Sequence, residues 1–272
     1  MDNSFTSFDF PDRLKAGLID EEHPAYDEAR ALYNGMIDKR PAWIVRCKDA
    51  DDVAAAVTHA RTANLLLAIR GGGHNGPGLG SCDGGLVLDM SPMKAIDVDA
   101  QARTVSVEAG CTQGEVDKVA AGHGLAVPAG IVSSTGIAGL TLGGGHGYLT
   151  RKHGLTIDNL LSAELVLANG QMVTASETEN TDLFWALRGG GGNFGVVTRF
   201  TYRAHPVSDV YGGPIFYDIA HAGDIMRWYR DYLPKAPRDL AIFFGIKIVP
   251  SCDPFPQAIW GRRICALISC FN

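Results

Sequence analysis

An arginine and a histidine enclose three consecutive glycines in the stretch Arg70-Gly71-Gly72-Gly73-His74, which continues as Asn75-Gly76. Glycines leave the backbone bare, so main-chain N–H groups can close around an anionic ligand without a side chain intervening. The guanidinium of Arg70, at the edge of this run, suits a phosphate oxygen. A loop that only held phosphate would not need an imidazole. The sequence therefore predicts an anion-binding loop in which His74 has a separate chemical role.

The segments around this loop predict the elements that position it. The apolar run 65–69 reads as a strand that leads directly into the glycines. A strand at 42–47 and a helix at 53–61 precede it, and acidic residues 49–52 cap that helix where its macrodipole favours them. Together these segments predict one βαβ unit. A shorter amphipathic helix is expected earlier, over 24–33.

The next part of the chain predicts strands in clusters rather than strict βαβ alternation, so the expected fold class is α+β. Asn169-Gly170 lies between two strand-like halves and is a strong hairpin signal. The other expected elements are strands at 86–89, 95–99, 104–109, 160–166, 171–175 and 196–202, an extended segment at 125–128, and helices at 113–121 and 181–188.

The composition changes after Pro206, where the glycine blocks stop. A helix over 222–232 and strands over 240–249 and 264–271 are expected there. The last strand is of the buried type and nothing follows it to pair with, an unusual way to end a domain. We therefore expect a first domain over 1–205 with its core at 40–205, and an incomplete second domain over 206–272.

Composition excludes several classes of function. The formal net charge of −6 and the lack of a Lys/Arg cluster argue against an electrostatic nucleic-acid partner. The six cysteines show no Cys-x-x-Cys and no metal-ligand spacing, so we expect reduced core residues and no metal site. The start Met1–Phe5 lacks the basic and apolar regions of a signal peptide, and no apolar run reaches about 20 residues. A cytoplasmic protein without a membrane segment is expected.

Two stretches, 71–76 and 190–195, match the dinucleotide fingerprint Gly-x-Gly-x-x-Gly by letter. That fingerprint needs a helix immediately afterwards, so that the pyrophosphate meets its N-terminus. The first match runs into Pro77-Gly78 and the second into a β-branched strand, so both fail. A Walker A sequence and a Gly-x-Ser-x-Gly elbow are also absent from the sequence.

What remains is a set of glycine-rich loops. Any one of them could be an ordinary tight turn, but together they favour a long, flat, phosphate-containing ligand lying across all of them. The expected loops are 70–76, 78–81, 128–136, 139–147 and 189–195.

These residues resemble a known family. The Arg70–His74 run followed by Leu86-Val87-Leu88-Asp89-Met90 is similar to the flavin-attachment region of the vanillyl-alcohol-oxidase superfamily, whose FAD-binding domain is of the PCMH type. The fuller set resembles the berberine-bridge-enzyme-like branch, which also includes sugar oxidases and hydroxynicotine oxidase. The matching stretches lie within about residues 40–205: Pro128-Ala129-Gly130, 136–147, 151–159 and 182–191.

The resemblance implies an FAD-binding domain of two α+β subdomains, followed by a substrate domain built on an antiparallel sheet. In the family, the histidine that ends the glycine run bonds covalently to the flavin 8α-methyl group, which here implies His74. Some members add a bond from a cysteine just after the Pro-x-Gly stretch, and Val132 stands at that position here. A single covalent attachment is therefore expected. The implied cofactor-binding residues are Arg70, Gly71, Gly72, Gly73, His74, Asn75, Gly78, Ser81, Pro128, Gly130, Val132, Thr135, Gly136, Gly139, Leu140, Gly143, Gly144, Gly145, Gly147 and Val197.

The resemblance also implies a reaction. The family oxidises small alcohols, sugars or amines by hydride transfer to flavin N5, and the reduced flavin passes electrons to O2, giving H2O2, or to another acceptor. The family's catalytic base often lies beyond the length of this chain. Tyr148 and Arg151 are candidates to approach the ring, with ordinary loop packing as the equal alternative. A second hypothesis is a flavin-binding fragment without turnover. A third, an NADPH-dependent peptidoglycan-precursor reductase, is disfavoured by the attachment signature.

Overall fold

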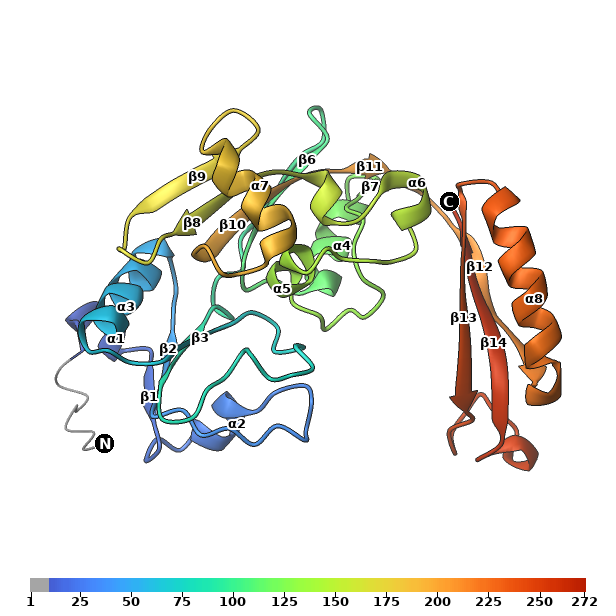
Figure 1. Ribbon diagram of the computed structural model, residues 1–272, viewed down its shortest axis with the longest axis horizontal. Helices are drawn as coiled ribbons and strands as arrows, with labels where there is room; N and C mark the ends of the chain where they lie inside the picture. Colours follow the sequence, from blue (N-terminus) through green and yellow to red (C-terminus); the bar gives the residue numbers. More distant parts are fainter. Residues whose placement is uncertain (1–9) are drawn as a thin grey trace.

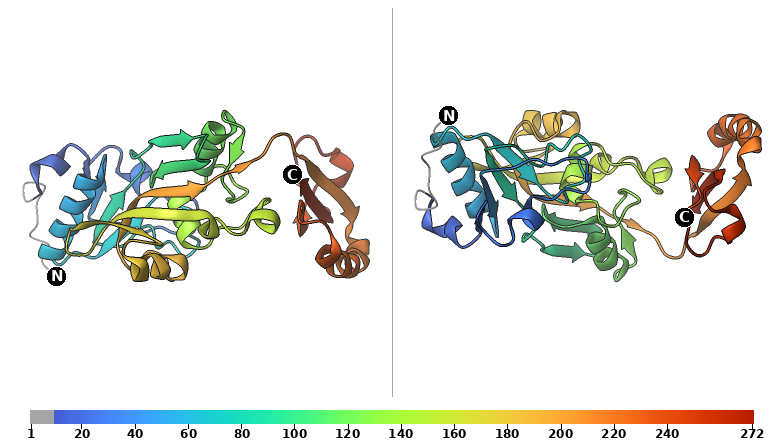
Figure 2. Two further views of the ribbon diagram at one scale, coloured as in Figure 1. Left: turned by 90° about the horizontal axis from the view of Figure 1, so that it is seen from above. Right: turned by 90° about the horizontal axis from the view of Figure 1, so that it is seen from below.

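The computed structural model describes residues 10–272 (Figure 1). The prediction made on Met1–Phe5 lies outside these residues. Figure 1 shows a larger assembly of sheets and helices and, beyond it, a separate small sheet with one long helix. Figure 2 shows this last sheet at one end of the molecule, connected to the rest by an extended segment. Within residues 10–272, no helix combines the length and apolar character needed to cross a membrane.

The first sheet has four strands in the order β1-β2-β4-β3. Strands β2 and β3 both run parallel to β4, as the predicted βαβ unit requires, and β1 pairs antiparallel with β2. Helix α3 connects β2 to β3 and is capped by Asp49, whose carboxylate accepts from the Asp52 N–H. The bounds are β1 Leu18–Asp20, β2 Trp43–Arg46, α3 Ala50–Thr62, β3 Leu67–Arg70 and β4 Leu86–Asp89, with α1 Asp12–Lys15 and α2 Tyr26–Arg30 before them.

The second sheet has five antiparallel strands in the order β5-β6-β10-β8-β9. The predicted hairpin between β8 and β9 is confirmed, and Gly170 adopts a φ of 84° in its turn. Thr112 and Glu115 form a capping box on helix α4. The bounds are β5 Ile96–Asp99, β6 Thr104–Glu108, α4 Gln113–Ala121, β8 Leu160–Val166, β9 Met172–Ser176, α7 Thr181–Gly190 and β10 Val196–Arg203, with a small pair β7 Leu125–Ala126 and β11 His205–Pro206.

The last strand pairs with two strands that precede it in the sequence. Strand β14 (Arg263–Phe271) is the central strand of a third sheet, between β12 (Tyr211–Asp218) and β13 (Leu240–Ile248). Sequence reasoning missed β12 because Gly212, Gly213 and Pro214 weaken its strand signal. Helix α8 (Ala222–Tyr232) packs beside this sheet, with the Tyr229 hydroxyl donating to Ile242 O. Short 3₁₀ turns complete the chain: η2 Ile157–Asn159, η3 Ile219–His221, η4 Leu233–Lys235 and η5 Gln257–Ile259.

Two further expectations are corrected. The block 139–147, expected as a loop, begins inside helix α5 (Ile137–Leu142), which buries Ile137 and Thr141 and leaves Gly139 exposed. The helix expected over 24–33 is shorter, since Ala31 is already extended. A further helix, α6, covers Thr150–His153. All six cysteines are free; five are buried as predicted, whereas Cys252 is exposed.

Candidate functional site

The first sheet delivers the glycine loop at the ends of two neighbouring strands. Arg70 is the last residue of β3 and pairs in register with Asp89, the last residue of β4. Its Nη2 donates to Asp89 Oδ2 over 2.9 Å, and its Nη1 donates to Ala29 O. Both side chains are buried. The expectation that this guanidinium faces a phosphate is therefore corrected: in the structure it anchors the loop to the sheet.

The glycine loop lies directly against the loop 130–136. A Cβ on Gly72 would lie 2.3 Å from Gly136 N, so the two backbones are in contact. Gly136 also bridges to Thr112, and the Gln113 N–H donates to Thr135 O over 2.8 Å. The N-terminus of α4 therefore holds the loop 130–136, and that loop in turn supports the glycine loop. An ordinary tight turn explains why a glycine stands at position 73, where φ is 69°. It does not explain the glycines at 72 and 136, whose φ values are not positive.

His74 lies at the junction of these two loops. Its Nε2 is 3.0 Å from Ser134 Oγ, and its Nδ1 is 3.4 Å from Thr135 Oγ1. The ring of Tyr33 stacks on the imidazole, with the ring centroids 3.9 Å apart and the planes at 16°. The imidazole is half-buried. Both ring nitrogens and one ring face are thus in contact with named groups of the chain.

The segment that follows His74 folds back as a set of turns. Asn75 Oδ1 accepts from the Leu79 N–H over 2.9 Å, and the Lys39 ammonium donates to the carbonyls of Gly78 and Ser81. No helix starts here, which confirms the rejection of the dinucleotide fingerprint. The Ser81 hydroxyl is buried without a hydrogen-bond partner among residues 10–272. This turn region lies beside β3, since a Cβ on Gly80 would contact the Arg70 side chain.

The loops 128–130 and 143–147 also lie against each other. A Cβ on Gly147 would overlap Ala129 O at 1.8 Å, and one on Gly130 would meet the Leu140 side chain at 2.5 Å. Gly144 and Gly145 have φ values of 102° and 76°. Pro128 is buried and Val132 is exposed. Four of the five predicted loops are therefore linked through direct contacts.

Gly139 has no such structural explanation. It lies in α5, is exposed, and a Cβ there would meet no atom within 4 Å. Glycine in a helix costs about 1 kcal/mol relative to alanine. A bare patch of helix backbone beside the loop system is what a closely approaching flat ligand needs.

The remaining predicted residues lie elsewhere. Loop 189–195 follows the kinked end of α7, and Gly195 packs against Val166 O of strand β8. Val197 is buried in β10 and pairs with Leu165.

Tyr148 and Arg151 face the third sheet. The Tyr148 ring meets Phe243 edge-on with centroids 5.2 Å apart, and His146 makes a similar contact at 5.3 Å. Arg151 Nη2 donates to Ala236 O over 3.0 Å. A hollow of about 380 Å³ lies here, lined by Thr150, Arg151, Lys152, Gly154, Pro234, Ala236 and Arg238.

Sequence reasoning missed Tyr33, Ser134 and Asp89 as partners of the loop. Tyr33 and Ser134 are distant from His74 in the sequence, and a lone tyrosine or serine carries no motif. Asp89 could have been found, because two parallel strands, 67–70 and 86–89, end in opposite charges. Such a pair is expected to meet at the shared edge of the sheet.

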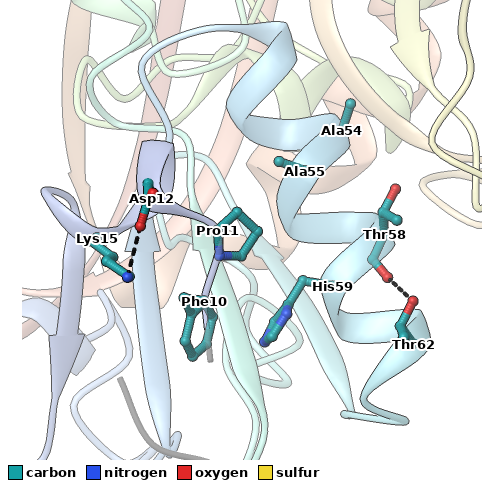
Figure 3. Close-up of a pocket in the computed structure, with 9 residues that line it drawn as sticks. All are labelled: Phe10, Pro11, Asp12, Lys15, Ala54, Ala55, Thr58, His59 and Thr62. Carbon is teal, nitrogen blue, oxygen red and sulfur yellow. Dashed lines mark hydrogen bonds and ion pairs between the residues drawn. The ribbon is translucent and has the colours of Figure 1, made fainter. Parts of the chain in front are cut away.

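A second hollow, of about 650 Å³, opens between α1 and α3 (Figure 3). It is lined by Phe10, Pro11, Asp12, Lys15, Ala54, Ala55, Thr58, His59 and Thr62. None of these is a predicted site residue, and Figure 3 shows Lys15 paired with Asp12 at its rim. Among residues 10–272, no group of three or more His, Cys, Asp or Glu side chains is arranged to hold a metal ion.

Bare-backbone loops around a half-buried histidine, on an α+β scaffold without a Rossmann helix, are the features that the resemblance to a PCMH-type flavoprotein implies. The sequence profile of a family described as FAD binding domain matches residues 41–176, and the chain belongs to this family. The prediction of an FAD-binding PCMH-type domain with a berberine-bridge-enzyme-like fold is confirmed.

Several known proteins are similar to the chain. An FAD-linked oxidoreductase from Dictyostelium discoideum is 41% identical over 218 residues, which cover 80% of this chain and 48% of the relative. The crystal structure of 6-hydroxy-D-nicotine oxidase from Arthrobacter nicotinovorans superposes with a TM-score of 0.85 at 30% identity, covering 93% of this chain and 55% of the other. BBE-like 1 from Physcomitrella patens gives 0.84 at 32%, covering 95% and 55%. The chain thus spans about half the length of the relatives it matches.

The residues present fit an FAD cofactor. Gly139 leaves open a position that a Cβ would fill, and the imidazole of His74 is fixed at the junction of two bare loops. Main-chain N–H groups of these loops suit phosphate oxygens without a charged side chain. This matters because the Arg70 guanidinium is engaged within the protein.

Proposed function

We propose that the chain is the FAD-binding part of an oxidoreductase that oxidises a small organic alcohol, sugar or amine. The observation that carries this proposal is His74, held by two hydroxyl groups and an aromatic ring at the meeting point of the glycine loops. The relatives named oxidoreductase or oxidase support it. When bound, FAD supplies the acceptor for the hydride, and O2 is the proposed acceptor of its electrons.

Within this function, we propose that His74 carries FAD through a covalent bond to a ring nitrogen. Val132, exposed on the loop beside Ser134, has no thiol, so His74 is the single attachment proposed. The loops 70–81, 128–136 and 143–147 bind the rest of the cofactor through their backbone. Val197, buried in β10, stays part of the proposed cofactor site.

We further propose a division of the chain into an FAD-binding domain over 1–205 and the beginning of a substrate domain over 206–272. Tyr148 and Arg151 contact residues of 236–243, so on this division the two side chains lie at the boundary between the two parts. In this arrangement they border the path of the substrate. A cytoplasmic location is part of the same proposal.

The second candidate function is flavin binding without turnover. It is favoured by one observation, namely that the chain spans about half the length of the similar proteins. In that case the same site holds FAD but oxidises no substrate.

Two measurements test these proposals. Intact mass after denaturation is expected to show the chain plus one FAD, with flavin fluorescence in the denaturing gel. His74→Ala is expected to lose both signals, while His146→Ala, a histidine of the other glycine block, keeps them. Flavin that is released by denaturant, or that remains in His74→Ala, contradicts the covalent link. Oxygen consumption with sugars, amines and hydroxylated aromatics then separates the oxidase from the binding protein, which holds flavin but consumes no oxygen.

A further inference from the structure

Residues 32–34 run alongside the glycine loop and contact it at successive positions. A Cβ on Gly73 would touch the Leu32 side chain at 3.5 Å, and the Tyr33 N–H donates to Gly73 O over 3.2 Å. The Asn34 amide donates to Gly76 O over 2.9 Å. The segment is therefore fixed to the loop by its backbone and by its side chains on both sides of Tyr33.

Tyr33 makes a defined side-chain contact although most of its surface is exposed. It is 68% exposed, so burial in the core does not explain its position. One face of its ring lies on the His74 imidazole, nearly parallel and 3.9 Å away between centroids. The interaction that orders this side chain is thus its contact with the proposed attachment residue.

We propose that Tyr33 is a positioning residue for flavin attachment: its ring holds the His74 imidazole in the plane from which a ring nitrogen reaches the cofactor. This inference rests on the proposed function of His74. A histidine ring has two soft torsions, and hydrogen bonds at its nitrogens alone leave it free to tilt about the line joining the two contacts. The stack on Tyr33 removes this tilt.

Orientation of this kind acts on the rate of bond formation. In this step a C–H bond of the 8α-methyl group and the imidazole N–H are broken, the C–N bond forms, and the two protons and two electrons released pass to O2, giving H2O2. The nitrogen must lie on the line to the carbon that it bonds, and misplacement by about 1 Å can cost about 100-fold in rate. Ser134, 3.0 Å from Nε2, fixes rotation within the plane, while Tyr33 fixes the plane itself. The Tyr33 hydroxyl has no part in the stack, so phenylalanine at this position is expected to support flavin attachment as well as tyrosine does.

The test compares four variants of the full chain. Tyr33→Ala removes the ring, Tyr33→Phe keeps it, and Tyr33→Leu keeps apolar bulk without a flat face. Met36→Ala is the matched control, because Met36 is 90% exposed in the same segment. Flavin-free protein, obtained from a riboflavin-starved host, is mixed with FAD, and covalent incorporation is followed by denaturing-gel fluorescence. Melting temperatures show that each variant is folded.

Tyr33→Ala and Tyr33→Leu are expected to slow incorporation by about tenfold or more, with Tyr33→Phe and Met36→Ala close to the wild type. A wild-type rate in Tyr33→Ala overturns the positioning role while leaving the attachment to His74 intact. Slowing in Tyr33→Phe equal to that in Tyr33→Ala also overturns it, because the ring is then not what matters.

A second readout needs no flavin. In the NMR spectrum of flavin-free protein, the ring protons of His74 are expected to be shifted upfield by the tyrosine ring current. This shift is expected to disappear in Tyr33→Ala and to persist in Tyr33→Phe. If the wild type forms no covalent flavin, the attachment proposal fails, and this spectrum decides the stack alone. A His74 signal that is unchanged in Tyr33→Ala overturns the positioning role.

Discussion

The backbones of Gly72 and Gly136 touch each other: a Cβ on Gly72 would lie 2.3 Å from Gly136 N, and one on Gly136 would lie 2.2 Å from Gly72 N. Neither contact can be relieved by a side-chain movement, because both partners are main chain. The two loops that surround His74 can therefore pack this closely only because neither glycine carries a side chain.

Gly72→Ala is expected to destabilise the fold by about 2–3 kcal/mol and to weaken flavin binding, because the loops must separate to admit a methyl group. Gly76→Ala is the matched control in the same loop, since a Cβ there meets nothing within 4 Å. Urea unfolding and flavin titration measure both effects. Equal behaviour of the two variants contradicts the close packing of the loops.

Asp89→Asn is expected to cost about 3–5 kcal/mol, because it leaves the buried guanidinium of Arg70 without its charge partner. The exposed pair of Arg227 and Asp224 supplies the comparison, and Asp224→Asn is expected to leave stability nearly unchanged. Denaturant midpoints at low and high salt are the measurement. A small loss in Asp89→Asn that vanishes at high salt argues for a solvated pair instead.

Removing the hydroxyl of Thr141 and removing that of Tyr202 are expected to cost different amounts of stability. Thr141 Oγ1 donates to Ile137 O, so it accepts from the Tyr202 hydroxyl, 2.7 Å away. Burial raises the pKa of Tyr202, which keeps this hydroxyl protonated. Thr141→Val leaves that donor buried and unpaired and is expected to cost about 1–3 kcal/mol, while Tyr202→Phe costs about 1 kcal/mol.

Thr141→Ser keeps the hydroxyl and both hydrogen bonds, and serves as the control for a substitution at this position that leaves the Tyr202 hydroxyl paired. Thermal unfolding of the three variants gives the order of their stability losses. The assignment of donor and acceptor is wrong if Tyr202→Phe is the more damaging change.

The environment of His205 is expected to make the fold less stable in mild acid. Its Nε2 is 2.7 Å from Asn159 Oδ1, and because the Asn159 amide nitrogen donates to His153 O and Leu155 O, His205 is the donor. The imidazole stacks on His153, with centroids 3.8 Å apart. Burial foremost, and then the nearby positive groups, lower the pKa of His205 to about 4.

Above about pH 6.5 the ring is neutral in both the folded and the unfolded chain. Between about pH 6.5 and 4 the unfolded chain binds a proton that the folded chain does not, so this contribution to stability is lost as the pH falls. Urea midpoints at several pH values are expected to fall less steeply in His205→Gln, whose amide can donate to Asn159, than in the wild type. The exposed His123→Gln is the control, and parallel curves for His205→Gln and the wild type contradict the prediction.

The local elements and the cofactor class could be predicted from the amino-acid sequence. Helices 113–121 and 222–232 and strand 86–89 were predicted with the bounds that the structure shows, because periodicity and caps are local signals. The Arg70–His74 motif pointed to FAD through its resemblance to a family, and the family is confirmed. Covalent attachment stays a prediction.

Tertiary structure alone decided what the motif residues touch. Arg70 turned toward Asp89, β14 became a central strand, and Tyr33 came to lie on His74. Each of these contacts joins residues that are distant along the chain, and its partner is chosen by which surfaces pack together. The glycines show the same division: the sequence marks where side chains are missing, and only the fold shows whether a ligand or another stretch of backbone occupies the space.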